Sequence, residues 1–510
     1  MSKKRRDSLG EQPSILPKSV ETRYHQNLEQ AKQLLAAYQQ GDRNAAVKFE
    51  EHHPLGKQPG FNPNLQDARL LTSAGTVRAK RLSLEKLKKD SKALLKALKT
   101  NQPQALDRLV QHHPKGQDCD VKALKLADAQ CIIARENGLA SWAKLKAHFT
   151  LIHQAYKQLQ RPHLTLDHDV ETLHIRCGSD IQTTLQDCGF AGEYMEISNP
   201  FPQGRVPPFD PLDQFVTLRS DFIVKHYAAD IPPEYADRVK NAPHEIRLVD
   251  QRLRALPQEI KRIVLWFEHD PFDQLCFAYV LAHLVNNHLG HCNIELIQVD
   301  RFPGVEKFIG LGYLSQHPEN LIALWQQRIS ITPAMMAFGA RCWHAFTADN
   351  PTELWQLSQG HSPLPLMQQA MQRMLKELPW TTNGLSLTEQ LTLAIVSRDG
   401  PINMARAFHF LNTESEPLSF LGDIMFLSAI RPLWQYETAA LQVTLHDAGK
   451  PAMRRDTVVI TATGHKLMKG ECNWLTICDP QYERWVGNVG VTHGVNNWYW
   501  CSEKHKPVLV

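Results

Sequence analysis

The segment from Arg262 to Val285 constrains the fold more than any other stretch of the chain. It begins with an apolar run, Ile263 to Phe267, which is short enough to be a buried strand. After Pro271 the apolar residues recur at helical spacing, and Pro271 itself suits the first turn of a helix. The pattern therefore predicts a strand, a polar turn and a helix.

The polar turn holds five chemically competent side chains, Glu268, His269, Asp270, Asp273 and Gln274. Ligands of open α/β sheets bind beyond the carboxyl ends of the strands, so this turn is a candidate ligand site. An equally open interpretation is that Glu268 and Asp270 only cap the helix and complement its dipole.

Composition favours a large globular protein without a membrane anchor. The chain has 510 residues, of which 43% are hydrophobic, and no apolar run reaches the length of a membrane span. Its start, residues 1–20, lacks the apolar core of a signal peptide, and the ten cysteines form no C-x-x-C pair. We therefore expect a cytoplasmic protein with neither a disulfide framework nor a zinc ribbon.

Charge is distributed unevenly along the chain. The first 150 residues carry 27 Lys and Arg against 15 Asp and Glu, whereas the whole chain carries 57 against 53. Such an excess suits an acidic partner, but a solvated helical surface is the commoner cause. Nucleic acid is therefore a less favoured partner than protein.

An internal repeat organises the N-terminal third. Residues 1–26 are predicted to be a disordered basic tail, and residues 27–150 an α-helical repeat module. Ala31 to Pro54 matches Ser91 to Pro114 at an offset of 60 residues. Repeated helical units usually bind proteins. Leu126 to Phe149 also resembles a segment that accompanies bacterial ankyrin-type repeats, although the ankyrin T-P-L-H signature is absent.

Residues 169–315 are predicted to form an α/β domain, followed by a helical connector over 316–382. Expected strands at Glu171–Cys177, Glu193–Ile197 and Asn293–Val299 alternate with helices, including Leu212–Tyr227. This alternation favours a wound parallel sheet. If the first strand neighbours the strand at Ile263, then Gly178, Ser179 and Asp180 meet the polar turn at one sheet edge.

Residues 383–510 have the outline of a winged helix. Three helical patterns, beginning at Gly384, Pro401 and Phe420, precede strand patterns at Leu441–Gly449 and Asp456–Gly470. The first helix carries a capping box, Ser386 with Glu389 three residues later. The fold class predicted for the whole chain is therefore multidomain, with a helical repeat module, a central wound parallel sheet and a C-terminal helical plus winged-helix-like domain.

Several motifs in order resemble a pair of bacterial families. LHIRCGSD at Leu173 and LWFEHDPFDQL at Leu265 resemble the domain of unknown function numbered 1835. GLSLTEQ at Gly384 and ERWVGNV at Glu483 resemble its C-terminal companion, numbered 3658. The resemblance implies an α/β domain followed by a helical and winged-helix-like part, and it brings no established activity.

The chain departs from the family pattern at three places. Asn199 stands where the family usually has Asp, Gly204-Arg205 stands where it has Gly-Pro, and Gly487-Asn488 replaces a Gly-Gly pair. An Asn cannot supply the negative charge that an Asp gives to a metal ligand or a general base. Activity transferred from relatives is therefore in doubt at this position.

The remaining candidates are defined by their chemistry. Gly178 and Ser179 offer backbone N–H groups to an anion, Arg176 and Arg219 are candidate phosphate forks, and His269 beside carboxylates suits a general base or a metal ligand. His174, on an apolar strand, is more simply a satisfied core histidine. The P-loop and dinucleotide motifs are absent from the sequence. We assign no metal site, and the cofactor and catalytic residues stay unassigned.

The sequence therefore favours a binding or regulatory protein. Its α/β domain is expected to bind a small anionic or nucleotide-like ligand, and its helical repeats a protein partner. The ligand-binding candidates are Arg176, Gly178, Ser179, Asp180, Asn199, Arg219, Glu268, His269, Asp270, Asp273 and Gln274. The alternative is an enzyme, a hydrolase or transferase, that acts on a nucleotide or other phosphorylated substrate at the strand ends.

Overall fold

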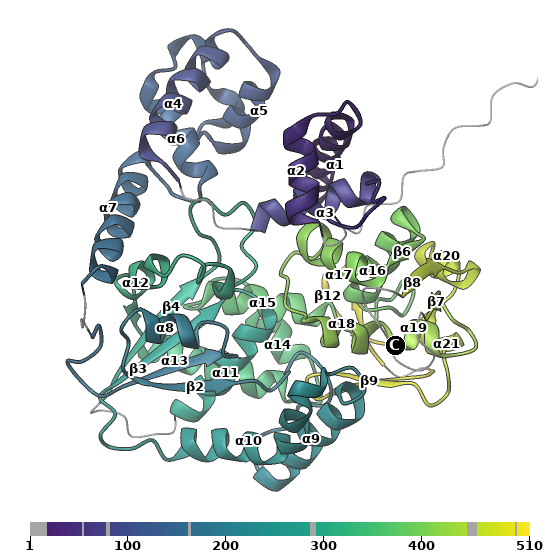
Figure 1. The fold of residues 1–510 in the computed structure, drawn as a ribbon. Coiled ribbons are helices and arrows are strands. Elements are labelled where there is room, and N and C mark those ends of the chain that lie inside the picture. The colour runs from purple at the N-terminus through teal and green to yellow at the C-terminus, as the bar shows by residue number, and fades with distance from the viewer. Residues whose placement is uncertain are drawn as a thin grey trace, which may run out of the picture.

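The chain folds as a mixed α/β structure in which helices predominate (Figure 1). The computed structural model describes residues 18–53, 56–77, 82–161, 165–285, 292–445, 456–494 and 497–510. Within these ranges, no helix combines the length and the apolar character needed to cross a bilayer.

Two helical units make up the N-terminal third. The first contains α1 (Lys18–Gln39), α2 (Arg43–His52) and α3 (Leu65–Val77), and the second contains α4 (Leu84–Lys99), α5 (Pro103–His112), α6 (Leu126–Glu136) and α7 (Trp142–Leu159). Helices α2 and α5 begin and end 60 residues apart, as the internal repeat requires. Residues 18–26 were predicted to lie in a disordered tail, but α1 includes them; residues 1–17 lie outside the described ranges.

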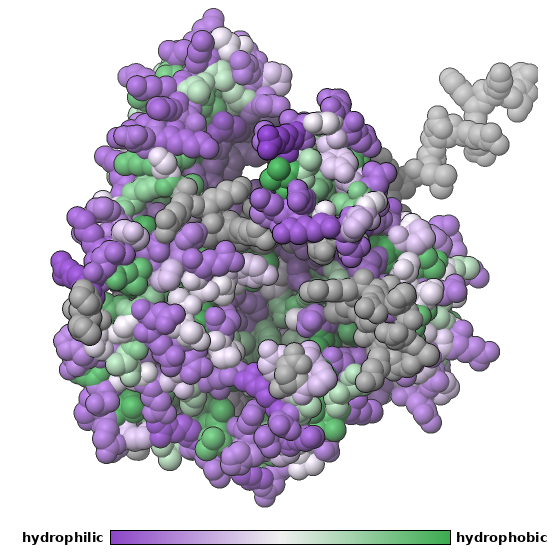
Figure 2. Space-filling view, viewed as in Figure 1, coloured by the Kyte–Doolittle hydropathy of each residue, from purple (hydrophilic) through white to green (hydrophobic). Residues whose placement is uncertain are grey.

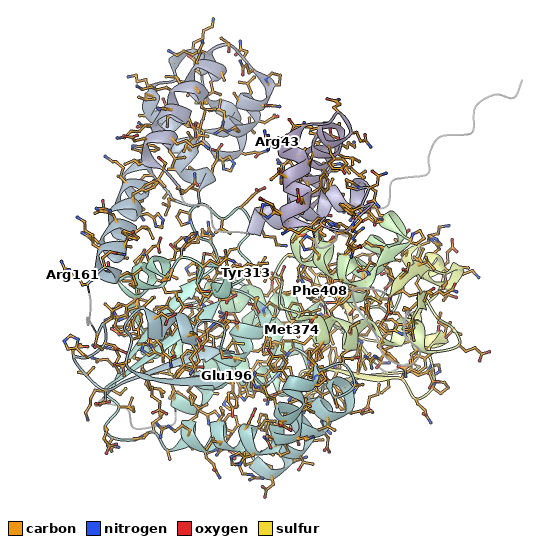
Figure 3. The ribbon with its side chains drawn as sticks, viewed as in Figure 1. Arg43, Arg161, Glu196, Tyr313, Met374 and Phe408 are labelled. Carbon is orange, nitrogen blue, oxygen red and sulfur yellow. The ribbon has the colours of Figure 1, made fainter. Side chains whose placement is uncertain are left out.

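Each unit packs on a different part of the molecule, and Figure 1 shows them as separate lobes. In the first unit, α3 contacts the C-terminal region, where Arg69 pairs with Asp399 and Glu414 at 2.7 Å each. In the second, α7 packs on α12 (Glu319–Trp325) of the α/β part, and Arg161, labelled in Figure 3, follows the end of α7. The rest of the second unit projects outward.

A five-stranded sheet forms the centre of the molecule. Its strands are β1 (Thr172–Cys177), β2 (Glu193–Ile197), β3 (Arg262–Glu268), β4 (Asn293–Val299) and β5 (Ile329–Ser330), in the order β2-β1-β3-β4-β5. The four longer strands pair in parallel, as predicted. The expectation of a wholly parallel sheet was wrong at one edge, because the two-residue β5 runs antiparallel to β4.

Helices cover both faces of this sheet. One face packs on α9 (Leu212–Tyr227), α10 (Ala236–Arg254) and α11 (Pro271–Leu284), and α13 (Pro333–Phe346) and α15 (Pro365–Leu375) lie behind α11. The other face packs on α7, α8 (Gln182–Asp187) and α12. Helix α11 is buried on nearly every side because it lies between the sheet and a second helical layer. This explains why its apolar residues are not confined to one stripe.

The C-terminal region combines short helices with small sheets. Its helices include α16 (Leu387–Asp399), α17 (Met404–Phe410) and α18 (Asp423–Ile430). Strands β6 (Ile402–Asn403), β7 (Leu441–Thr444) and β8 (Thr457–Ile460) form one antiparallel sheet in the order β6-β8-β7. Three short helices are also present, α14 (Thr352–Leu357), α19 (Pro432–Gln435) and α21 (Trp474–Ile477). Two antiparallel hairpins follow, β9 (Glu483–Val486) with β10 (Val489–Thr492), and β11 (Trp498–Cys501) with β12 (Lys506–Leu509).

One strand prediction in this region was wrong. The pattern at Asp456–Gly470 was interpreted as strand and turns, but the strand ends at Ile460 and α20 (Ala462–Met468) follows. Thr461 caps α20, because its side chain accepts a hydrogen bond from the Gly464 N–H at 3.1 Å. Such a cap starts a helix directly after a β-branched run.

Candidate functional site

The turns after β1 and β3 lie at the same edge of the sheet. The two strands are parallel neighbours, and Arg176 pairs in register with Trp266. This confirms the predicted convergence of the two turns. Strand order also reverses between β1 and β3, since β2 lies outside β1 and β4 outside β3. Open α/β sheets bind ligands at such a switch point.

Arg176 is the centre of the cluster at this edge. Its guanidinium is buried and makes ion pairs with Glu268 and Asp273. Its Nε and Nη2 also donate to the two carboxylate oxygens of Asp180, at 3.2 and 3.1 Å. The fork that the sequence suggested for a phosphate is therefore occupied by carboxylates.

Asp270 and Gln274 have structural partners in the turn. Oδ1 of Asp270 caps α11 by accepting the N–H groups of Phe272 at 2.8 Å and of Asp273 at 3.2 Å. Gln274 donates to the Glu268 carbonyl and accepts from Gln298 at 3.0 Å. The interpretation of Asp270 as a helix cap therefore holds for Oδ1. It does not account for Oδ2, to which the described residues donate no hydrogen bond.

A loop that the sequence analysis missed closes over this cluster. The N–H of Leu311 donates to Oε1 of Glu268 at 2.7 Å. A Cβ at Gly310 would lie 3.3 Å from Oε2 of Glu268, and a Cβ at Gly312 would lie 2.9 Å from Oδ2 of Asp180. A side chain at either position would require these carboxylates to shift, and the Gly-Leu-Gly spacing was the available signal. Tyr313, labelled in Figure 3, ends the 3₁₀ turn Leu311–Tyr313 of this loop.

Burial dominates the electrostatics of the cluster. Glu268, Asp270 and Asp273 are each 5% exposed or less. Burial raises the pKa of Glu268 to about 8, against the opposing attraction of Arg176. Burial likewise raises the pKa of Asp270 and of Asp273 to about 7. A single guanidinium does not balance three buried carboxylates and the half-exposed Asp180, so the cluster favours an additional positive charge.

These three carboxylates have the geometry and chemistry of a cation site. Glu268, Asp270 and Asp273 can each offer one oxygen, and these oxygens lie within 4.8 Å of one another. A set of hard oxygen donors suits Mg²⁺, Mn²⁺ or Ca²⁺. No metal site was assigned from the sequence, although all three residues were named there as ligand-binding candidates.

Two of the predicted site residues form a separate cluster. Asn199, just after β2, accepts at Oδ1 from Nε of Arg219 at 2.9 Å. The guanidinium of Arg219 also donates to three backbone carbonyls, those of Pro200, Gln203 and Arg205. The prediction that Arg219 joins the strand-end site was therefore wrong, because Arg219 points from α9 into the loop after β2. Asn199 follows the carboxyl end of β2, but its side chain bonds to Arg219 and not to the carboxylates after β3.

His269 and the glycine turn also contribute less than predicted. The ring of His269 faces Phe308, with centroids 5.5 Å apart, and burial lowers its pKa to about 4. The N–H of Gly178 donates to the Ile197 carbonyl at 3.1 Å, so it is not free for an anion. Ser179 is exposed. His174 is the predicted satisfied core histidine, because Trp266 donates to its Nδ1 at 3.1 Å and Asp167 lies 3.0 Å from its Nε2.

Arg219 carries a buried charge without a carboxylate partner. It is 0% exposed, burial lowers its pKa to about 10, and it forms no ion pair within the described ranges. We expect Asn199→Asp to raise the free energy of unfolding at neutral pH by about 1–3 kcal/mol, because a charged acceptor replaces a neutral one. Chemical denaturation measures this change. A variant less stable than wild type would contradict the account.

A cavity with a mainly apolar lining lies beside this second cluster, not over the carboxylates. It has a volume of about 490 Å³ and lies between the end of β2, α9, α10 and the start of α18. Asn199 and Glu196 line it, and Figure 3 labels Glu196. Phe272 joins the two regions, because it lines the cavity and donates its N–H to Asp270.

Comparisons with known proteins give no assignment. No protein-family model matches the chain, and no curated protein matches it.

Proposed function

We propose that the chain is a binding or regulatory protein whose α/β domain takes a small phosphorylated or nucleotide-like ligand at the β1/β3 switch point through a divalent cation. The observation that carries this proposal is the group of three buried carboxylates at that edge. A bare phosphate would be repelled by them, whereas a cation would neutralise them and attract phosphate oxygens. The apolar cavity beside Phe272 would take the uncharged part of the ligand.

The second helical unit is proposed as the surface for a protein partner. Helix α4 exposes six lysines, Lys86, Lys88, Lys89, Lys92, Lys96 and Lys99. The lobe projects from the rest of the molecule, and its visible face is mainly hydrophilic (Figure 2). Its basic character favours an acidic protein surface.

The C-terminal region is proposed to be a winged helix that packs within the molecule. Its elements follow the order α16, β6, α17, α18, β7, β8, with β6 pairing β8. Helix α18, the third helix of this order, packs on α9, and α17 packs on α3 of the first helical unit. Surfaces covered in this way, together with the acidic residues of this region, oppose the use of these helices on DNA. The resemblance to the families numbered 1835 and 3658 remains part of the proposal.

The experiment is a thermal unfolding series on the full chain. We expect Mg²⁺ with a nucleoside triphosphate or diphosphate to raise the unfolding temperature by more than the sum of the shifts that each causes alone, because ligand and cation share one site. Additive or absent shifts across a nucleotide panel would contradict the proposal.

An enzyme is the second candidate because of the pKa values at this site. Carboxyl groups whose pKa lies at about 7 or 8 exchange protons near neutral pH, as a general acid or base must. Release of phosphate from a bound nucleotide in the presence of Mg²⁺ would favour this candidate over a binding protein.

A further inference from the structure

A second cavity, with several charged residues in its walls, lies between the α/β part and the C-terminal region. It has a volume of about 340 Å³. One wall comes from α9 and the loop after β2, and the other comes from α16, the α18–α19 junction and β9. This volume is at the lower end of the range for small-molecule sites, about 300–1,000 Å³.

Glu389 presents an unsatisfied carboxylate oxygen in the cavity wall. The residue is 2% exposed. Its Oε2 accepts the N–H of Ser386 at 2.7 Å, which completes the capping box of α16. Its Oε1 is buried and has no hydrogen-bond partner among the described residues. Burial raises the pKa of Glu389, against the opposing attraction of Arg484 and the hydrogen bonds from Ser386.

Arg484 presents the complementary group from β9. Its Nε donates to the Tyr482 hydroxyl at 3.0 Å, and its Nη1 donates to the Glu377 carbonyl at 2.6 Å. Its Nη2 is buried and has no partner within the described part of the chain. Arg484 attracts Glu389, yet no ion pair joins them in the described structure. Two residues that line one cavity therefore each keep a buried, unpartnered polar atom, and the two side chains carry opposite charges.

We propose that this cavity binds a small zwitterion of the α-amino acid class, with its ammonium group on Oε1 of Glu389 and its carboxylate on Nη2 of Arg484. A ligand carrying only a negative charge would meet Glu389 unfavourably, and one carrying only a positive charge would meet Arg484. Trp485 and Arg205, whose guanidinium lies 4.8 Å from the centroid of the Trp485 ring, also line the cavity and would border the ligand's side chain. Because the walls come from two parts of the molecule, the bound ligand would hold them together.

The test uses the full chain and the proteinogenic L-amino acids, added singly in thermal unfolding and calorimetric titration. We expect at least one amino acid to bind and to raise the unfolding temperature. Its α-amide, which lacks the carboxylate, and its deaminated acid, which lacks the ammonium group, are expected to bind at least about tenfold more weakly. Binding by neither the amino acids nor these analogues would overturn the proposal.

The decisive variant is Glu389→Gln, because Gln preserves the capping box while it removes the charge. We expect the variant to fold with unchanged or higher stability, since an uncompensated buried charge is lost, and to bind the amino acid at least about tenfold more weakly. Asp128→Asn is the matched control, because Asp128 likewise accepts the N–H of a helix N-cap residue, that of Lys125 at 2.7 Å, and lies outside the cavity. Equal binding by wild type and Glu389→Gln would overturn the proposal, as would equal losses in both variants.

Discussion

Arg176→Met is expected to lower the free energy of unfolding at neutral pH by about 3–5 kcal/mol, the usual cost of leaving buried charges without their partner. Arg176 is the only guanidinium that contacts Glu268 or Asp273 in the described structure. Met retains much of the side-chain volume of Arg. The expected decrease in the free energy of unfolding therefore comes mainly from the removed charge and less from altered packing. Chemical denaturation followed by circular dichroism measures it.

The pH dependence of the stability lost in Arg176→Met shows whether the lost charge or altered packing causes it. The pKa values of Glu268, Asp270 and Asp273 are raised in the folded protein, to about 8, 7 and 7. Folding therefore takes up protons between about pH 4 and pH 8, and the contribution of these groups to stability is lost as the pH rises through that window. We expect Arg176→Met to be least damaging near pH 5, where the folded carboxyl groups are protonated. A loss independent of pH would point to packing instead, and Arg176→Lys, which keeps the charge, should lose less at neutral pH.

Arg69→Met is expected to loosen the first helical unit from the C-terminal region, at a cost of about 3–5 kcal/mol for breaking a buried pair. Arg69 is 2% exposed, joins Asp399 and Glu414, and lies 4.0 Å from the ring centroid of Phe410. Amide hydrogen exchange should show lost protection in α3 and in residues 411–415, which α3 contacts.

The matched control for this variant is Arg108→Met. Arg108 makes an equally well-formed pair with Glu136, at 2.6 and 2.8 Å, but its side chain is 42% exposed. Exposed pairs contribute only about 0–1 kcal/mol, so exchange in the second unit should change little. Equal effects of the two variants would contradict the distinction between a buried interface and a surface pair.

The sequence predicted the framework where local signals were strong. The bounds of α9, β2 and β4 agree with those expected, because proline, glycine or a change of hydrophobic period marks their ends. The strand-end cluster followed from one rule, that neighbouring parallel strands bring their carboxyl ends together. The second step assumed that the strands at Glu171 and Ile263 are neighbours, which the structure confirms.

The sequence did not predict where side chains point or which distant loop covers the site. The Gly310–Gly312 loop approaches Glu268 from more than forty residues away, and its spacing alone does not indicate what it covers. Arg219 was placed with the wrong cluster because a helical position does not reveal which loop it faces. Arg205 and Asn488 were noted separately as departures from a family pattern, yet Nε of Arg205 donates to Oδ1 of Asn488 at 2.8 Å.

Calorimetric titration with Mg²⁺ and Mn²⁺ tests most directly the claim that the switch-point carboxylates hold a cation. Asp270→Asn removes one charge while Asn keeps the N-cap of α11. Asp42→Asn is its control, because Asp42 caps the remote α2 by accepting the Ala45 N–H at 2.7 Å. We expect wild type and Asp42→Asn to bind one cation, and Asp270→Asn to bind it at least about tenfold more weakly, because the charge of the ligands sets the affinity of a carboxylate site. Absence of cation binding in the wild type, or equal binding by all three proteins, would contradict the account.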